Sequence, residues 1–242
     1  MRWALAVLAV LIATAPHGRA GEPVDLTLVL VSDVSRSIDD SEYALEKQGY
    51  ATAFTDPDVL AAITGGAVGA VAVSYVEFAA RNQVTTLVGW TVIRDAASAR
   101  AFAHRLLDAG RTAWGRTSIS AGLSAAIKLQ DSSGFDAARR VIDVCGDGTN
   151  NNGDPVAPIR DAAVEGGMVV NGLAIINDHP VSWIFAHVQP PGGLAKYYRE
   201  NVTGGVGSFV LEVHDFASFA AAMKRKLISE IAAAGPSRLR IE

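Results

Sequence analysis

Oxygen-bearing side chains alternate with other residues in the segment Asp33-Val34-Ser35-Arg36-Ser37. The alternation allows Asp33, Ser35 and Ser37 to direct three oxygens from one extended loop toward a common point. Carboxylate and hydroxyl oxygens are hard ligands that suit Mg²⁺, Mn²⁺ or Ca²⁺, whereas zinc and copper favour imidazole and thiolate. Taken alone, the motif is more typical of a turn that caps a helix, so a metal site needs further donors from elsewhere in the chain.

Two further polar clusters occur later in the chain. Thr117 lies at the start of a predicted helix with Ser118 and Ser120 close behind, and Asp147 follows an apolar run that ends at Cys145. Each cluster alone also fits a helix cap or an ordinary turn. Together they predict one divalent-metal site, with Mg²⁺ as the expected ion and Mn²⁺ or Ca²⁺ as alternatives. The predicted ligands are Asp33, Ser35, Ser37, Thr117 and Asp147.

The elements that would position these residues alternate between strand and helix. Predicted strands cover residues 26–32, 69–78, 84–93, 140–145, 168–176 and 208–213. Predicted helices cover residues 39–54, 95–109, 118–130, 158–165 and 216–234, with short helices possible at 183–188 and 194–201. Strands that are apolar on both faces fit the centre of a parallel sheet covered by helices. The short connection between 69–78 and 84–93 predicts a hairpin, and therefore one antiparallel edge strand.

The fold class that follows is α/β: three layers around an open, mostly parallel sheet of Rossmann type, with one antiparallel edge strand. In such sheets ligands bind outside the carboxyl ends of the strands. The loops after residue 32, before residue 118 and after residue 145 all fall at that edge. The predicted topology therefore brings the three polar clusters together.

The N-terminus has the layout of a secretory signal peptide. A basic start at Arg2 precedes an apolar run of about 13 residues, and small residues surround Ala20. The run is shorter than the roughly 20 residues needed to span a bilayer, although a membrane anchor is the alternative interpretation. We therefore expect residues 1–20 to be removed and the protein to be exported, to the periplasm or outside the cell. The mature chain is expected to form one domain over 24–234 with a tail over 235–242. We expect no membrane span in the mature chain.

The composition excludes several classes of function. Half of the 242 residues are hydrophobic, which is the balance of a globular domain. Loss of residues 1–20 leaves 19 of the 21 basic residues against 25 acidic ones, and a mildly acidic chain without a basic stripe is a poor nucleic-acid binder. The chain has no Gly-x-Ser-x-Gly elbow, no His-Glu-x-x-His motif and no Walker-type phosphate loop. Cys145, the only cysteine, lies in an apolar run and is expected to be a buried thiol.

The three clusters resemble the three parts of the metal-ion-dependent adhesion site of von Willebrand factor A domains. The matching segments are Asp33-Val34-Ser35-Arg36-Ser37, Gly115-Arg116-Thr117-Ser118 and Gly146-Asp147-Gly148. More narrowly, the chain resembles a bacterial exported family catalogued as domain of unknown function 1194. The segments that carry this narrower resemblance are 31–39, 47–51, 75–78 and 145–151.

The resemblance implies a role for each predicted ligand. Ser35, Ser37 and Thr117 would contact the metal directly, and Asp33 and Asp147 would contact it directly or through water. Sites of this kind leave one coordination position for an acidic residue of a partner protein. The resemblance therefore implies a metal-dependent protein-binding module and not an enzyme, with a partner that the sequence does not identify.

One position departs from the family pattern. Arg116 stands where the family often has a glycine. Its guanidinium could compete with the metal for carboxylates, or it could hold an acidic partner. Trp114 precedes the same loop, so we expect Arg116 and Trp114 at the rim of a partner-binding surface.

Two alternative functions stay open at this point. Asp33 could be the nucleophile of a Mg²⁺-dependent phosphohydrolase, although such enzymes usually have a second carboxylate two residues later, where Ser35 stands. The domain could also be a scaffold whose metal site is not functional.

Overall fold

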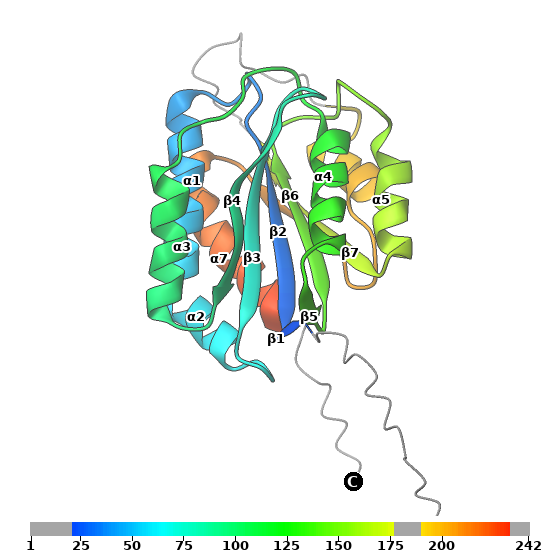
Figure 1. The fold of residues 1–242 in the computed structure, drawn as a ribbon. Coiled ribbons are helices and arrows are strands. Elements are labelled where there is room, and N and C mark those ends of the chain that lie inside the picture. Colours follow the sequence, from blue (N-terminus) through cyan, green and yellow to red (C-terminus); the bar gives the residue numbers. More distant parts are fainter. Residues whose placement is uncertain (1–20, 177–189, 233–242) are drawn as a thin grey trace, which may run out of the picture.

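The central element is a six-stranded sheet with the strand order β4-β3-β2-β6-β7-β8 (Figure 1). The computed structural model describes residues 21–176 and 190–232. The strands are β2 (Leu26–Asp33), β3 (Val71–Phe78), β4 (Val84–Ile93), β6 (Arg140–Gly146), β7 (Met168–Ile175) and β8 (Val210–Val213). Only the pair β3–β4 is antiparallel, and the other neighbouring pairs are parallel. The predicted mostly parallel sheet with one antiparallel edge strand is confirmed.

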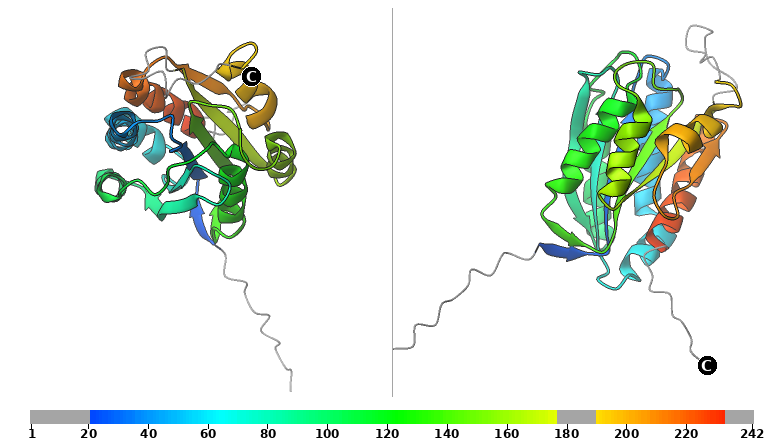
Figure 2. Two further views of the ribbon diagram at one scale, coloured as in Figure 1. Left: turned by 90° about the horizontal axis from the view of Figure 1, so that it is seen from above. Right: turned by 90° about the vertical axis from the view of Figure 1, so that its right-hand side faces the viewer.

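Helices cover both faces of the sheet (Figure 2). One face carries α1 (Asp40–Thr55), α2 (Pro57–Thr64), α3 (Ala96–Asp108), the short turn η2 (Phe216–Ser218) and α7 (Phe219–Ala232). The other face carries α4 (Ile119–Asp131), α5 (Val156–Glu165), α6 (Leu194–Tyr197) and the π-helical turn η1 (Tyr198–Val202). No helix in the described parts of the chain is both long and apolar enough to cross a bilayer.

Strand β2 shows why the sheet has three layers. All eight of its residues are buried. Leu28 and Leu30 pack into the core on the side of α1, whereas Val29 and Val31 pack into the core on the side of α4. Because side chains alternate across a strand, a run that is apolar at every position requires a hydrophobic layer on each face.

Two features of the fold were not predicted. No helix was predicted directly after the one over 39–54, but Asp56-Pro57 begins α2. The Asp56 carboxylate accepts a hydrogen bond from the Asp58 amide at 2.8 Å, and Pro57 occupies the first turn. A small parallel pair, β1 (Glu22–Val24) with β5 (Phe135–Ala137), was also missed because three-residue strands carry no usable periodicity. The predicted signal peptide, the short helix at 183–188 and the tail from 235 lie outside the described residues.

A buried ionic cluster joins α7 to the sheet. The Lys226 ammonium lies 2.7 Å from the Asp143 carboxylate and 2.6 Å from the Glu230 carboxylate, and these side chains are fully buried. Asn171 donates a further hydrogen bond to Glu230 at 2.7 Å. Burial raises the pKa of Asp143 to about 7, although the neighbouring ammonium opposes this shift. The cluster is a polar anchor inside an otherwise apolar layer.

Candidate metal centre

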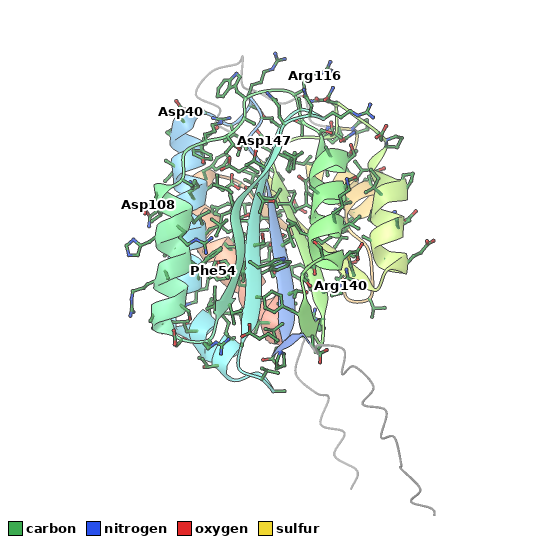
Figure 3. All side chains as sticks on the ribbon, viewed as in Figure 1. Asp40, Phe54, Asp108, Arg116, Arg140 and Asp147 are labelled. Carbon is green, nitrogen blue, oxygen red and sulfur yellow. The ribbon has the colours of Figure 1, made fainter. Side chains whose placement is uncertain are left out.

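The predicted ligands come from three loops at the carboxyl end of the parallel strands. Asp33 is the last residue of β2, and Asp147 directly follows β6. These strands are parallel neighbours with Ser32 opposite Cys145, so the two carboxylates emerge side by side. Thr117 approaches from the loop before α4. Figure 3 shows Asp147 at this edge with Arg116 above it.

A continuous chain of hydrogen bonds links four of the five side chains. The Thr117 hydroxyl donates to Ser35 Oγ at 3.0 Å, Ser35 Oγ lies 3.1 Å from Ser37 Oγ, and the Ser37 hydroxyl donates to Asp147 Oδ1 at 2.9 Å. Asp33 joins them through its Oδ1, which accepts from the Ser35 amide at 2.8 Å. All five residues are buried, and the most exposed, Ser37, is only 7% exposed. The structure therefore brings all five predicted ligands together.

Backbone hydrogen bonds hold the first loop against the end of β3 and against the second loop. The Val34 amide donates to the Phe78 carbonyl at 2.8 Å, and the Arg36 amide donates to the Gly115 carbonyl at 2.9 Å. The bond between Asp33 and the Ser35 amide turns the chain immediately after β2. These bonds place the hydroxyls of Ser35 and Thr117 on the same side.

The third loop supports the Thr117 side of the site. Asn151 Oδ1 accepts from the Thr117 amide at 3.0 Å, and Asn150 Oδ1 accepts from the Ser120 amide at 3.1 Å. The Ser118 and Ser120 hydroxyls lie 3.3 Å from each other, and neither is hydrogen-bonded to the serines of the first loop. Thr117 is consequently the hydroxyl of this segment that joins the ligand group.

Gly146 allows two polar side chains to approach closely. A Cβ atom at this position would lie 2.9 Å from Asp33 Cβ and 2.9 Å from the Tyr198 hydroxyl oxygen, closer than atoms can pack. The fully buried Tyr198 therefore approaches the ligand group from beneath. Burial and the nearby Asp33 charge raise its pKa well above the ordinary value. Sequence reasoning missed Tyr198, because it lies in a stretch with weak periodicity.

Arg111 is a second residue that the sequence did not single out. Its Nη2 donates to the carbonyl oxygens of Val34, Ser35 and Ile38 at 2.7, 2.8 and 2.9 Å. Its Nε donates to the Ala113 carbonyl at 3.1 Å. The side chain is only 12% exposed, and its hydrogen bonds hold the backbone of the Asp33 loop in place. No local sequence signal marks Arg111, because three of its four carbonyl acceptors lie more than 70 residues earlier.

The two predicted rim residues differ in their surroundings. Trp114 is 50% exposed, and its ring lies 4.3 Å from the guanidinium carbon of Arg111. Arg116 is exposed directly beside the ligand Thr117, and its guanidinium forms no hydrogen bond or ion pair with any described residue. Within the described residues, Arg116 therefore does not pair with the ligand carboxylates of Asp33 and Asp147.

A buried carboxyl lies beneath the first loop. Ser32, which precedes Asp33, donates a short hydrogen bond to Glu46 of α1, and Glu46 is 1% exposed. Burial raises the pKa of Glu46 to about 8, and the charge of Asp33 acts in the same direction. The Glu46 carboxyl beneath the site is therefore mostly protonated at neutral pH.

The donor set fits a hard divalent cation. Two carboxylates and three hydroxyls converge, and oxygen donors of this kind suit Mg²⁺, Mn²⁺ or Ca²⁺. The described residues contain no group of three or more His, Cys, Asp or Glu side chains that could hold a metal ion, so a cation at this site depends on the hydroxyl ligands.

The chain matches one protein family over most of its length. Residues 23–235 match the family described as "Protein of unknown function (DUF1194)". The chain belongs to the DUF1194 family. No curated protein matches the sequence.

Solved structures similar to this DUF1194 protein establish its fold as von Willebrand factor A-like. Proximal thread matrix protein 1 from the mussel byssus, in a structure with a zinc-occupied MIDAS motif, has a TM-score of 0.63 at 17% identity, over 88% of this chain and 49% of that one. A von Willebrand factor type A protein from Catenulispora acidiphila has a TM-score of 0.58 at 16% identity, over 87% and 43% of the chains. The pilus adhesin SpaC from Lactobacillus rhamnosus GG has a TM-score of 0.55 at 15% identity, over 87% and 31%. The chain thus spans half or less of the length of these proteins.

Proposed function

We propose that this DUF1194 protein is an exported binding module that captures a partner protein through a divalent cation. The observation that carries the proposal is the buried chain of hydroxyls from Thr117 through Ser35 and Ser37 to the Asp147 carboxylate. Three of the five ligands are uncharged hydroxyls, so only Asp33 and Asp147 offset the charge of a bound divalent cation, and one coordination position can take a carboxylate of the partner. We infer no catalytic role for these side chains.

The proposed ligands are Asp33, Ser35, Ser37, Thr117 and Asp147. We propose Mg²⁺ as the ion, supported by the hard oxygen donors of the site. The zinc-occupied MIDAS motif of the mussel protein supports a divalent cation in general. Export is proposed from the apolar N-terminal segment, and a periplasmic or secreted location follows from it.

Thermal unfolding with and without metal tests the proposal. An ion at about one hundred times its Kd stabilises a protein by about 2.7 kcal/mol. For a domain of this size that corresponds to an increase in Tm of roughly 5–10 °C. We expect Mg²⁺ or Mn²⁺ to produce this increase in the intact protein, and Asp33→Ala or Ser35→Ala to abolish it.

Ser120→Ala is the matched control, because Ser120 is also a buried serine but its hydroxyl pairs only with Ser118 and not with the ligand chain. It should retain the metal-dependent increase. No increase in the intact protein, or an increase that survives Ser35→Ala, would contradict the proposal. Turnover of generic phosphate esters that is lost in Asp33→Asn would replace it with the phosphohydrolase.

A further inference from the structure

Each of the first two ligand loops places an arginine beside a ligand. Arg36 lies between Ser35 and Ser37, and it is exposed while both serines are buried. Arg116 precedes the buried Thr117 and is also exposed. The hydrogen bond from the Arg36 amide to the Gly115 carbonyl at 2.9 Å makes the two arginine positions neighbours.

Nearby acidic residues have other partners. Asp40 lies 3.3 Å from Arg111, and Asp154 lies 3.8 Å from Arg81. By contrast, the side chains of Arg36 and Arg116 form no ion pair or hydrogen bond within residues 21–176 and 190–232. These two guanidinium groups are available to an outside anion.

Metal binding changes the charge of this face. Without a cation, the carboxylates of Asp33 and Asp147 offset the charges of Arg36 and Arg116. A divalent cation neutralises the two carboxylates, which leaves the arginine charges uncompensated around it. We call the surface around Arg36 and Arg116 with a cation bound the loaded face. This loaded face is strongly positive over a small area, whereas the same surface without a cation is close to neutral.

We propose that the loaded face recognises an acidic protein segment with several carboxylates, of which one binds the metal and others pair with Arg36 and Arg116. This inference rests on the proposed metal-dependent binding and names the chemistry of the partner. A single carboxylate satisfies the cation but leaves both guanidiniums in water. A segment with alternating acidic residues satisfies all three positive groups, and Arg–carboxylate pairs add geometric selectivity to charge.

The test uses two capped synthetic peptides and isothermal titration calorimetry. One peptide has a single central aspartate among glycines, and the other has three aspartates that alternate with glycines. The metal alone is titrated first, then each peptide with saturating Mn²⁺ and with EDTA. Exposed ion pairs contribute roughly 1.5- to 5-fold each, so the peptide with three aspartates should bind about 2- to 25-fold more tightly. Raising the salt to about 150 mM, where the Debye length is about 8 Å, should reduce this gain.

Arg36→Gln and Arg116→Gln should each remove part of the gain in affinity of the three-aspartate peptide over the single-aspartate peptide. Together they should abolish this gain while Mn²⁺ still binds. Arg100→Gln is the control, because Arg100 is an exposed arginine in the middle of α3 and should leave the gain intact. Equal affinity for both peptides, or a gain that survives the double substitution, overturns this inference and leaves metal-dependent capture standing. Failure of Mn²⁺ to bind at all overturns the proposed function, and the acidic-segment inference with it.

Discussion

Replacement of Arg111 by methionine separates two effects that arginines have near a cation. Methionine keeps much of the side-chain volume beside Tyr43 and Trp114 but removes the guanidinium. By charge alone, loss of a positive group near the site should strengthen metal binding. By geometry, it removes the hydrogen bonds that hold the Asp33 loop, which should weaken metal binding. The two arguments predict opposite signs.

The magnitude follows from the contacts. Arg111 Nη2 carries two protons but lies 2.7–2.9 Å from three carbonyl oxygens, so about two full hydrogen bonds are shared among them. Hydrogen bonds to a charged donor contribute about 1.5–3 kcal/mol each, and water can replace part of that here. After this replacement by water, the loss in loop ordering is about 1.5–3 kcal/mol. Since 1.4 kcal/mol is a factor of ten, Mn²⁺ affinity should fall by roughly 10- to 100-fold.

Calorimetric titration with Mn²⁺ measures this effect, with Arg116→Met as the matched control. Arg116 lies in the same loop and carries the same charge, but its guanidinium forms no hydrogen bond or ion pair with a described residue. Its replacement should leave the affinity unchanged or raise it slightly. Unchanged or stronger Mn²⁺ binding by Arg111→Met, in a variant that keeps its Tm without metal, would refute the argument that Arg111 positions the loop.

Two further predictions concern the buried charges. Lys226→Met leaves the carboxylates of Asp143 and Glu230 buried without their cation, so urea unfolding should show a loss of about 3–5 kcal/mol in the free energy of unfolding. Lys224 is a more exposed lysine on the same helix, so Lys224→Met should change stability little, and equal effects of the two substitutions would contradict the argument. The pKa of Glu46 is raised to about 8 in the folded protein, so above the ordinary pKa of a glutamate the folded state holds a proton that the unfolded state has lost. The free energy of unfolding should therefore fall as the pH rises toward 8, by up to about 1.4 kcal/mol per pH unit. Glu46→Gln should flatten this dependence between about pH 5 and pH 8 in urea titrations, and parallel curves for the two proteins would rule out Glu46 as its source.

The order of strands and helices could be predicted from the sequence because it depends on local periodicity. The run 26–32 is apolar at nearly every position, and only a strand covered on both faces can bury such a run. The hairpin of β3 and β4 followed from the short connection between two strand-like segments. Periodicity failed where an element was too short, as in β5, or where one dipeptide both ended and began a helix, as at Asp56-Pro57.

The five candidate ligands could also be predicted from the sequence, because a parallel sheet brings the carboxyl ends of its strands to one edge. Their residue types and their places after the strands were sufficient for Asp33 and Asp147. Only the tertiary structure decided that Thr117, and not Ser118 or Ser120, completes the group of hydroxyls. It also brought in Arg111 and Tyr198, whose contacts lie far away along the chain. Local patterns report which face of an element is buried, whereas the atoms that meet across loops depend on how the whole chain packs.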